Sequence, residues 1–340
     1  MPARVAINGY GRIGQCLLRA LYENGYRDQL QVVAINELSD PETIAHLTRF
    51  DTTHGRFAGQ VDVSGLGLVV DGDPIRIVRE SEAQNLPWGE IGVDLVLDCT
   101  GLGATREQGR KHLDAGAGRV LFSQPGDPDL DATLVYGVNH ETLSAGDRIV
   151  SNASCTTNCI VPIIQALDAA YGIEQGSTTT IHSAMNDQPV IDAYHHQDLR
   201  RTRSAFHNMV PVDTGLARGI ERLLPSMAGR FSSVAVRVPT INVSAIDMTV
   251  AVRSQTDTDS VNAVLAETAA SSLDGIIGYT EELLASTDFN HDARSGVVDA
   301  GQTRVSGGRM VKVLCWFDNE WGYANRMLDV ARYWGLLRED

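Results

Sequence analysis

Short apolar runs alternate with amphipathic segments along the first half of the chain. Residues 4–9 (RVAING), 30–37 (LQVVAINE) and 93–101 (VDLVLDCTG) are apolar enough to be buried strands. Residues 16–25 (CLLRALYENG) carry apolar side chains at helical spacing and stop at a glycine. Fully apolar strands separated by helices indicate a parallel sheet that is covered on both faces. The first half is therefore predicted to be a Rossmann-type α/β domain.

The pattern changes after Cys155. Residues 158–172 (NCIVPIIQALDAAYG) predict one long helix, and the runs 177–185 (STTTIHSAM), 232–240 (SSVAVRVPT) and 245–253 (AIDMTVAVR) alternate in the manner of strands with one buried face. Such strands predict a mixed or antiparallel sheet. The second domain is therefore expected to be an α+β catalytic domain.

The domain boundary is expected at Cys155. We predict an NAD-binding domain over residues 1–154, which a C-terminal helix within 318–340 completes, and a catalytic domain over residues 155–317. Near the end of the chain, residues 317–325 (FDNEWGYAN) are expected to be a polar loop, followed by a helix over residues 326–337.

Composition narrows the possible functions. The 340 residues carry a formal net charge of −15, which argues against nucleic-acid binding because a phosphate backbone would be repelled. No run approaches the roughly 18–20 apolar residues of a membrane span, and the N-terminus has no signal-peptide pattern. The five cysteines are odd in number and lack C-x-x-C spacing, so they predict reduced thiols in the cytoplasm and neither a disulfide framework nor a metal site.

A glycine-rich turn joins the first strand to the first helix. Gly9, Gly11 and Gly14 form a G-x-G-x-x-G pattern, in which the first two glycines permit a tight turn and close approach of a pyrophosphate. The third glycine lets helix and strand pack, and the free N–H groups of the helix attract phosphate. Glu37 ends the second strand about twenty residues further on, where an acid binds the ribose hydroxyls. No arginine follows Glu37 closely, which favours NAD over NADP. The alternative for the glycine pattern is a strand–helix turn that binds no ligand. The alternative for Glu37 is a surface acid at the end of a strand.

Cys155 follows the polar run SNAS and precedes a predicted helix. Unpaired N–H groups at a helix start favour a thiolate and could hold the oxyanion that forms when it adds to a carbonyl. A small residue tolerated at a helix cap is the alternative. Cys159, one turn further along beside Ile160, is expected to be buried and inert.

A thiolate nucleophile needs a base, and nine histidines compete for that role. His182 ends an alternating strand, where its side chain could point into a cleft, although a lone strand histidine is more often structural. Arg237 lies inside an apolar strand and needs a partner, either a substrate phosphate or a buried carboxylate. Arg200, Arg201 and Arg203 form a cluster that could bind a ligand, face solvent or contact another subunit.

Together these motifs resemble the glyceraldehyde-3-phosphate dehydrogenase superfamily. The matching segments run in order along essentially the whole chain and are INGYGRIG, DTTHGRF, DCTG, SNASCTTNC, DLRRTR, RVPT and WFDNEWGYANR. The resemblance implies that Cys155 is the nucleophile and His182 its base. It also implies NAD as cofactor, a small phosphorylated aldehyde as substrate, and a homotetramer.

The resemblance further assigns the binding residues. The implied cofactor-binding residues are Gly9, Gly11, Arg12, Ile13, Gly14, Glu37, Thr100, Ser123, Asn319 and Tyr323. The implied substrate-binding residues are Arg237 in one anion site and Ser154, Thr156, Arg201, Thr214 and Gly215 in a second.

Within the superfamily, the motif TIHSAMNDQ is most like the erythrose-4-phosphate dehydrogenase branch. Phosphorylating relatives have a threonine three residues after the catalytic histidine, and this chain has Met185 there. The branch oxidises erythrose 4-phosphate to 4-phosphoerythronate in pyridoxal phosphate synthesis, through a thioester that water hydrolyses. The alternatives are a phosphorylating glyceraldehyde-3-phosphate dehydrogenase, a semialdehyde dehydrogenase and a non-enzymatic redox sensor that binds NAD.

Overall fold

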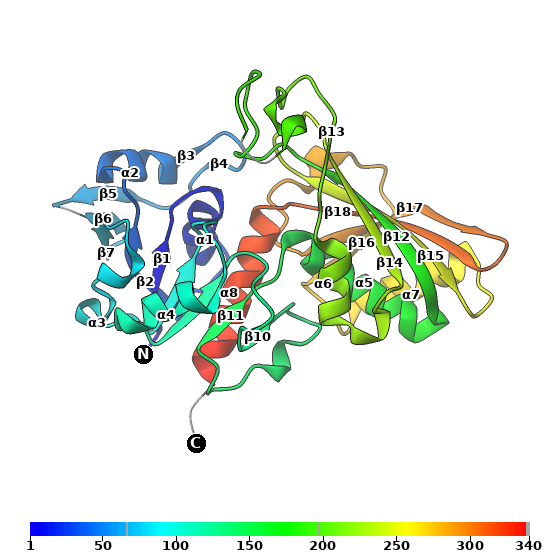
Figure 1. Ribbon diagram of the computed structural model, residues 1–340, viewed down its shortest axis with the longest axis horizontal. Coiled ribbons are helices and arrows are strands. Elements are labelled where there is room, and N and C mark those ends of the chain that lie inside the picture. The colour runs from blue at the N-terminus through cyan, green and yellow to red at the C-terminus, as the bar shows by residue number, and fades with distance from the viewer. Residues whose placement is uncertain (66, 196–197, 338–340) are drawn as a thin grey trace. The chain divides into compact units, whose positions relative to one another are not determined.

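The computed structural model describes residues 1–65, 67–195 and 198–337. The chain divides into two compact units. Unit 1 comprises Met1–Ser154 and the segment that starts at Tyr323, and unit 2 comprises Cys155–Gly322. Figure 1 shows the elements of both.

Unit 1 is built on a sheet whose order, in the described residues, is β10-β11-β9-β8-β1-β2-β7-β6-β5. Its strands are β1 (Ala3–Asn8), β2 (Leu30–Asn36), β5 (Val61–Ser64), β6 (Gly67–Val70), β7 (Asp73–Val78), β8 (Leu95–Asp98), β9 (Arg119–Phe122), β10 (Ala132–Thr133) and β11 (Ile149–Ser151). The seven strands from β10 to β7 pair in parallel, whereas β5 pairs antiparallel with β6 and β6 antiparallel with β7. The hairpin between β6 and β7 turns at Asp71 and Gly72, which both have positive φ.

The sheet contains the strand reversal of dinucleotide-binding folds. The chain runs from β1 through β2 to β7 on one side, and then returns to the other side for β8, β9 and β11. The reversal therefore lies between β1 and β8, and the carboxyl ends of those two strands form the edge where such folds bind a ligand. Unit 1 confirms the predicted Rossmann-type domain.

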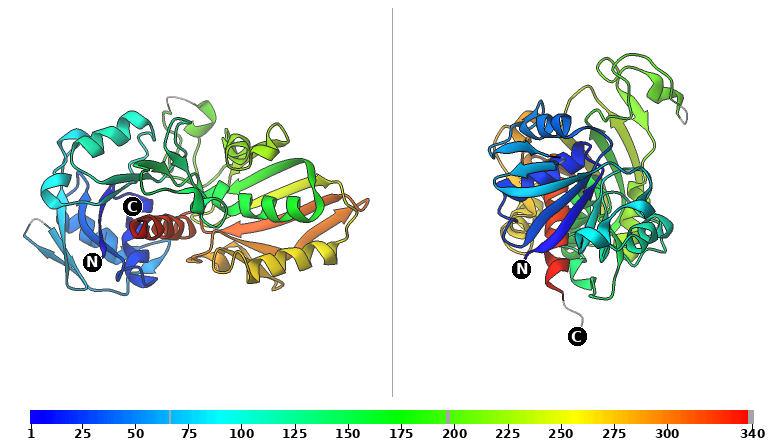
Figure 2. Two further views of the ribbon diagram at one scale, coloured as in Figure 1. Left: turned by 90° about the horizontal axis from the view of Figure 1, so that it is seen from below. Right: turned by 90° about the vertical axis from the view of Figure 1, so that its left-hand side faces the viewer.

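Helices join the strands of unit 1. They are α1 (Arg12–Glu23), α2 (Pro41–Arg49), α3 (Trp88–Ile91) and α4 (Arg106–Asp114), with the short 3-10 helices η1 (Ala83–Asn85) and η2 (His140–Thr142) and the small ribbon of β3 (Phe50–Asp51) and β4 (Gly55–Arg56). The last helix, α8 (Trp321–Leu336), lies beside the sheet of unit 1 (Figures 1 and 2). Its Trp334 carbonyl accepts a hydrogen bond from Arg119 at 2.5 Å, and its Asp329 accepts one from Tyr26 at 2.9 Å.

Helix α8 begins earlier than the sequence analysis predicted. The expected polar loop over residues 317–325 is already helical from Trp321. Asp318 explains the difference, because its Oδ1 accepts hydrogen bonds from the backbone N–H groups of Glu320 at 3.0 Å and Trp321 at 2.8 Å. A carboxylate in this position caps a helix start. Residues 338–340 of the predicted C-terminal segment lie outside the described residues.

Unit 2 is built on a mixed sheet whose order, in the part that the structure describes, is β13-β14-β12-β15-β18-β17-β16. Its strands are β12 (Ile173–His182), β13 (Val210–Val212), β14 (Phe231–Arg237), β15 (Ser244–Val252), β16 (Ile277–Thr280), β17 (Gly296–Ser306) and β18 (Met310–Phe317). β12 pairs in parallel with β14 and antiparallel with β15. The predicted mixed-sheet α+β domain is confirmed.

Three helices lie alongside this sheet (Figure 1). They are α5 (Cys155–Tyr171), α6 (Leu216–Leu223) and α7 (Thr258–Ala270), and the 3-10 helices are η3 (Leu199–Thr202), η4 (Pro225–Met227) and η5 (Ser286–Phe289). Helix α5 is buried over most of its first three turns, and it contacts both neighbouring helices and the sheet. Such burial holds the start of α5 in a fixed place. Cys159 is fully buried as expected, with its Sγ 3.4 Å from that of Cys315.

Among the described residues, no helix combines the length and the apolar character that a membrane crossing requires.

Candidate active site

The glycine-rich turn of unit 1 has room for a phosphate group. Gly9 has φ of +88°, and a Cβ atom there would lie 2.9 Å from the backbone of Thr100. A Cβ on Gly14 would lie 2.3 Å from the Gly9 carbonyl oxygen, so this glycine permits α1 to pack on the turn. A Cβ on Gly11 would meet nothing within 4 Å, so that position opens into free space. Gly11 precedes α1 and offers it no side-chain cap. The start of α1, at Arg12 and Ile13, therefore faces a space that fits a pyrophosphate.

Glu37 lies directly against this turn. Its carboxylate accepts hydrogen bonds from the backbone N–H of Tyr10 at 3.0 Å and of Leu38 at 2.8 Å. Because a carboxylate oxygen can accept more than one hydrogen bond, Glu37 can still accept ribose hydroxyls in this position. The turn and the acid thus form one continuous surface that fits the adenosine half of NAD.

Thr100 and Ser123 follow the carboxyl ends of β8 and β9. Thr100 Oγ1 donates to Asp98 Oδ1 at 2.7 Å, and the N–H of Ser123 donates to the Asp98 carbonyl at 2.9 Å. Burial alone would raise the pKa of Asp98, but its hydrogen bonds, first with His112 and then with Asn8 and Thr100, hold that pKa below the ordinary value. A charged, fully bonded Asp98 therefore supports this edge of the sheet.

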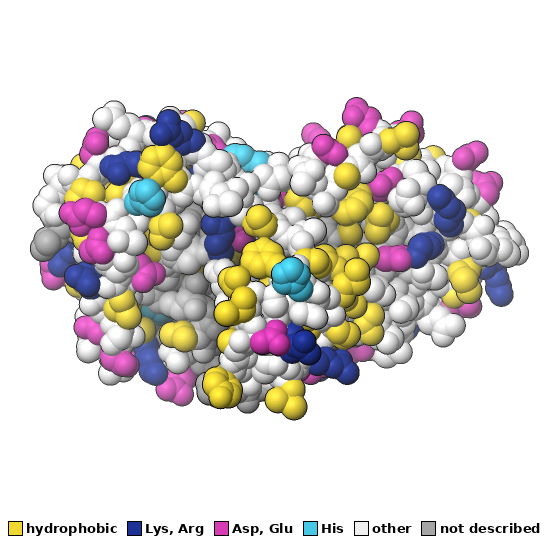
Figure 3. Space-filling view, turned by 90° about the horizontal axis from the view of Figure 1, so that it is seen from above, with side chains coloured by type: hydrophobic (Ala, Val, Ile, Leu, Met, Phe, Trp, Pro, Cys, Tyr) yellow, Lys and Arg dark blue, Asp and Glu magenta, His cyan; other side chains and the backbone are white. Residues whose placement is uncertain are grey.

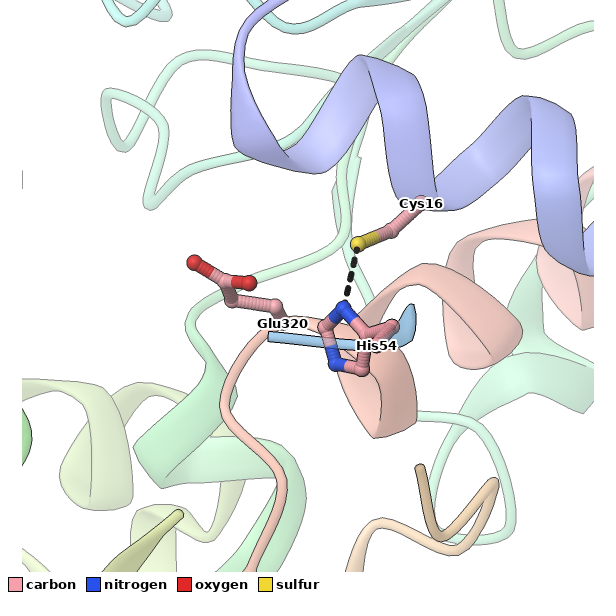
Figure 4. A group of neighbouring side chains, drawn as sticks. All are labelled: Cys16, His54 and Glu320. Carbon is pink, nitrogen blue, oxygen red and sulfur yellow. Dashed lines mark hydrogen bonds between the residues drawn. The ribbon is translucent and has the colours of Figure 1, made fainter. Parts of the chain in front are cut away.

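Arg12 also belongs to a buried charged cluster. Its guanidinium lies 2.9 Å from Asp51, whose carboxylate is also 3.5 Å from Arg19 and from His54. Burial opposes the charge of Asp51, but hydrogen bonds from His54 and Arg12 lower its pKa. His54 Nδ1 lies 3.7 Å from Cys16 Sγ (Figure 4). His54 is thus engaged within unit 1, where it holds the start of α1.

Cys155 is the first residue of α5. The chain reaches it through Ala153, which has a left-handed φ of +54° and whose N–H donates to Ser151 Oγ at 3.0 Å. The hydroxyl of Tyr323 donates to the Ala153 carbonyl at 3.1 Å, so Tyr323 supports this turn. Ser154 and Thr156 flank the cysteine in the chain.

Burial is the largest influence on the pKa of the Cys155 thiol. Burial raises its pKa to about 12 and outweighs the lowering effect of the backbone N–H groups of Thr156 and Cys155. The sequence analysis expected the helix start to favour the thiolate. The backbone N–H groups do lower the pKa of Cys155, but the loss of hydration raises it by more. A neighbouring base would help this thiol to lose its proton.

His182 supplies a base at the end of β12. Its Nε2 lies 3.9 Å from Cys155 Sγ, and its Nδ1 lies 2.8 Å from the carbonyl oxygen of Ser183. A carbonyl only accepts hydrogen bonds, so Nδ1 carries the proton and the Nε2 lone pair faces the thiol. Burial lowers the pKa of His182, so the imidazole is neutral near neutral pH. The pair can therefore pass the thiol proton to Nε2.

Arg237 ends β14 in register with His182 on β12. Its guanidinium bonds the carboxylate of Asp187 at 2.6 and 3.1 Å, and Nη2 lies 3.5 Å from the sulfur of Met185. Arg201 reaches the same carboxylate at 3.0 Å. Partial burial would raise the pKa of Asp187, but Arg237 and then Arg201 hold it below its ordinary value. The partner expected for Arg237 is thus a carboxylate in this structure.

Thr214 and Gly215 lie elsewhere in unit 2, before α6. They line a surface hollow of about 620 Å³ together with Arg200 and Arg218. A Cβ on Gly219 would lie 2.7 Å from a methyl carbon of Thr157, so α6 packs closely on the first turn of α5. The structure brings Arg200 to these residues, whereas Arg201, which the sequence analysis grouped with them, joins Arg237 around Asp187.

Asn319 follows β18 and is nearly buried. Its Oδ1 accepts hydrogen bonds from Ser183 Oγ at 2.9 Å and Ser244 Oγ at 2.8 Å. The sequence analysis did not single out Ser183, Ser244 or Asp187, and it named Arg200 only as part of an arginine cluster. Ser183 and Asp187 lie within the motif TIHSAMNDQ, and their place in this motif could have marked them as site residues. No signal in the sequence pointed to Ser244, because only strand pairing brings this residue to Asn319.

Two family models match the chain. Residues 3–106 match the model for the glyceraldehyde 3-phosphate dehydrogenase NAD binding domain, and residues 154–319 match the model for the glyceraldehyde 3-phosphate dehydrogenase C-terminal domain. The first match covers the glycine-rich turn and Glu37, and the second covers Cys155, His182 and Asn319. The chain therefore belongs to the glyceraldehyde-3-phosphate dehydrogenase superfamily, and it is an NAD-dependent oxidoreductase that acts on an aldehyde.

Proposed function

We propose that this enzyme oxidises D-erythrose 4-phosphate to 4-phosphoerythronate and that water, not phosphate, releases the product. The observation that carries the proposal is Met185. It stands where phosphorylating relatives have a threonine, and its sulfur lies 3.5 Å from Arg237. A thioether cannot donate a hydrogen bond to a substrate phosphate. The site beside Arg237 is thus poorer in donors than that of a phosphorylating enzyme.

In the proposed mechanism, Cys155 Sγ adds to the aldehyde carbon while its proton passes to His182 Nε2. Neutral His182 is suited to this step, because its Nδ1 proton is committed to the Ser183 carbonyl. The N–H groups at the start of α5 stabilise the oxyanion of the thiohemiacetal. Bound NAD+ supplies the hydride acceptor. Oxidation of the thiohemiacetal leaves a thioester on Cys155.

Water then releases the acyl group. Its oxygen bonds to the thioester carbon, the carbon–sulfur bond breaks, and one water proton passes to His182 Nε2 once that atom is free of its first proton. The products are a carboxylate, the regenerated thiol and a proton. His182 thus serves as base in both halves of the reaction.

The proposed cofactor site consists of the glycine-rich turn, Glu37 and residues that follow strand ends. Its members are Gly9, Gly11, Arg12, Ile13, Gly14, Glu37, Thr100, Ser123, Asn319 and Tyr323. Glu37 favours NAD because a carboxylate beside the ribose repels a 2′-phosphate.

The proposed substrate site contains two sets of anion-binding groups. The first is Arg237, together with Arg201 across Asp187. The second proposed set is Ser154, Thr156, Thr214 and Gly215, of which Thr214 and Gly215 line the hollow together with Arg200. A carboxylate already satisfies the first set, whereas the second retains the groups that phosphorylating relatives use.

That second set favours an alternative function, a phosphorylating glyceraldehyde-3-phosphate dehydrogenase. A comparison of NADH formation separates the two. Erythrose 4-phosphate and glyceraldehyde 3-phosphate are each supplied with and without inorganic phosphate, and the products are identified by phosphorus NMR. We expect erythrose 4-phosphate to be preferred, with turnover independent of phosphate and a carboxylate as product. A preference for glyceraldehyde 3-phosphate with an acyl phosphate product would overturn the proposal.

We further propose that the enzyme acts in the cytoplasm in pyridoxal phosphate synthesis and is a homotetramer. Large hydrophobic side chains of the segment 185–209 support the assembly, since a monomer rarely exposes so many together. The most exposed of them are Val190, Ile191, Tyr194, Leu199 and Met209. Figure 3 shows hydrophobic side chains gathered on the face that carries this segment. Sedimentation velocity would test the assembly, and a monomer at micromolar concentration would contradict it.

A further inference from the structure

Three buried polar side chains of unit 2 form a closed ring of hydrogen bonds. The backbone N–H of Ser183 donates to Ser244 Oγ at 3.1 Å. Ser244 Oγ in turn donates to Asn319 Oδ1 at 2.8 Å, and Ser183 Oγ donates to the same oxygen at 2.9 Å. Ser183 and Ser244 are 0% and 1% exposed, and Asn319 is 9% exposed. Hydrogen bonds in such a ring polarise one another and hold the geometry tightly.

The ring determines which way the Asn319 amide faces. Ser244 Oγ already accepts the Ser183 N–H, so its own proton is available for Asn319. Two hydroxyl donors then use both lone pairs of Oδ1, and Nδ2 must point away from the serines. Among the residues that the structure describes, none accepts a hydrogen bond from Asn319 Nδ2. The amide therefore offers an oriented donor on the side of its remaining exposed surface.

Ser183 also connects this amide to the catalytic base. Its carbonyl accepts the Nδ1 proton of His182, while its hydroxyl binds Asn319. The first contact is made by the backbone and the second by the side chain. A substitution of Ser183 can therefore disturb Asn319 without removing the contact that orients His182.

We propose that Ser183 and Ser244 are positioning residues that fix the Asn319 amide, so that its Nδ2 donates to the carboxamide of NAD and determines which face of the nicotinamide accepts the hydride. This rests on the proposed function, in which Asn319 binds the nicotinamide. An asparagine amide can turn over with almost no change in shape, and it then exchanges a donor for an acceptor. After such a turn the two buried hydroxyl protons would lose the acceptor that they have in Asn319 Oδ1, so the serines oppose the exchange.

The test compares Asn319→Ala with the double variant Ser183→Ala/Ser244→Ala. Equilibrium binding of NAD+ is followed by quenching of protein fluorescence, and the face of hydride transfer is followed by NMR of NADH formed from NAD+ that is deuterated at C4. We expect each variant to weaken NAD+ binding by about tenfold, the equivalent of one hydrogen bond. We also expect each to yield a mixture of both NADH epimers. Combining the substitutions should add little, because they remove one contact.

Three controls keep the outcomes distinct. Thr178→Val removes another buried hydroxyl of β12, whose partner is Ser233 at 2.8 Å, and should leave NAD+ affinity and facial selectivity unchanged. Asn319→Asp keeps the oxygen that faces the serines but loses the donor, so it should weaken binding as Asn319→Ala does. The rate of Cys155 alkylation should stay within twofold in the double variant, which shows that the fold and the His182 contact persist.

If Asn319→Ala weakens NAD+ binding and the double serine variant binds and transfers hydride as the unaltered enzyme does, the inference is wrong while the proposed function stands. If Asn319→Ala itself changes neither property, both the inference and the proposed role of Asn319 are wrong. A double variant whose alkylation rate collapses with its NAD+ affinity would mean that the serines support the whole site and not the amide alone, which also overturns the inference.

Discussion

His182 Nε2 lies 3.9 Å from Cys155 Sγ, and the proton on the opposite side of the imidazole is donated to the Ser183 carbonyl at 2.8 Å. Burial favours the neutral form of both members of the pair, because it raises the pKa of the thiol to about 12 and lowers that of the imidazole. The site therefore favours the thiol form of Cys155 before an aldehyde binds. In the proposed mechanism, the thiolate forms when the proton moves from sulfur to nitrogen as the aldehyde is attacked.

Replacing Cys155 with serine should abolish turnover, with a loss of at least about 10³-fold, because a hydroxyl is a far weaker nucleophile at this pH. NAD+ binding should persist, because the glycine-rich turn is untouched. The measurement is NADH formation at saturating aldehyde. A redox-sensing protein that binds NAD would show the same slow background rate before and after the substitution. Cys159→Ala is the matched control and should retain turnover, since Cys159 is buried against Cys315.

The alkylation of Cys155 by iodoacetamide should depend on pH through His182. In the unaltered enzyme the neutral imidazole accepts the thiol proton, so the rate should rise with pH and level off above the imidazole pKa, which burial places below 6.5. In His182→Ala the rate near neutral pH should fall. It should then keep rising with pH toward the pKa of the thiol. Equal rates at pH 7 in both proteins would mean that the helix start alone activates the sulfur.

Met185→Thr should move the enzyme toward phosphorylating chemistry. The new hydroxyl would lie beside Arg237 and supply the donor that the thioether lacks. We expect the KM for glyceraldehyde 3-phosphate to fall about tenfold, the value of one hydrogen bond to a charged group. Steady-state kinetics with both aldehydes measure the change. Met209→Thr alters an exposed methionine of the same segment and should leave both KM values unchanged.

Two glycine variants separate cofactor binding from packing. Gly11→Ala places a Cβ in open space, so stability should be kept while the Kd for NAD+ rises by at least about tenfold, because the methyl group takes the volume of the phosphates. Gly14→Ala places its Cβ 2.3 Å from a carbonyl oxygen and should lower Tm by several degrees. Calorimetry measures both properties. Unchanged NAD+ affinity in Gly11→Ala would place the pyrophosphate elsewhere.

Local sequence was sufficient for the elements and the family. Apolar runs separated by amphipathic segments predicted the parallel sheet of unit 1, and the change to alternating residues after Cys155 predicted the mixed sheet of unit 2. Gly9, Gly11 and Gly14 could be placed in one turn because their spacing is short and follows a strand. These features are determined by residues that are close together in the sequence, so they can be predicted from it directly.

The chemistry of the site depended on contacts that no local pattern contains. The start of α8 was missed, because the capping role of Asp318 was not read from the polar run around it. The effect of burial on the pKa of Cys155 could not be anticipated, because burial is a property of the packed structure, and here it outweighs the helix start. Folding brings together strands and loops that are far apart in the chain. Only then does Arg237 pair with Asp187, and Asn319 with Ser244. The sequence alone thus determined the fold class and the family, and the tertiary structure decided the partners and orientation of the candidate site residues, because hydration and hydrogen bonding are fixed only when the chain has packed.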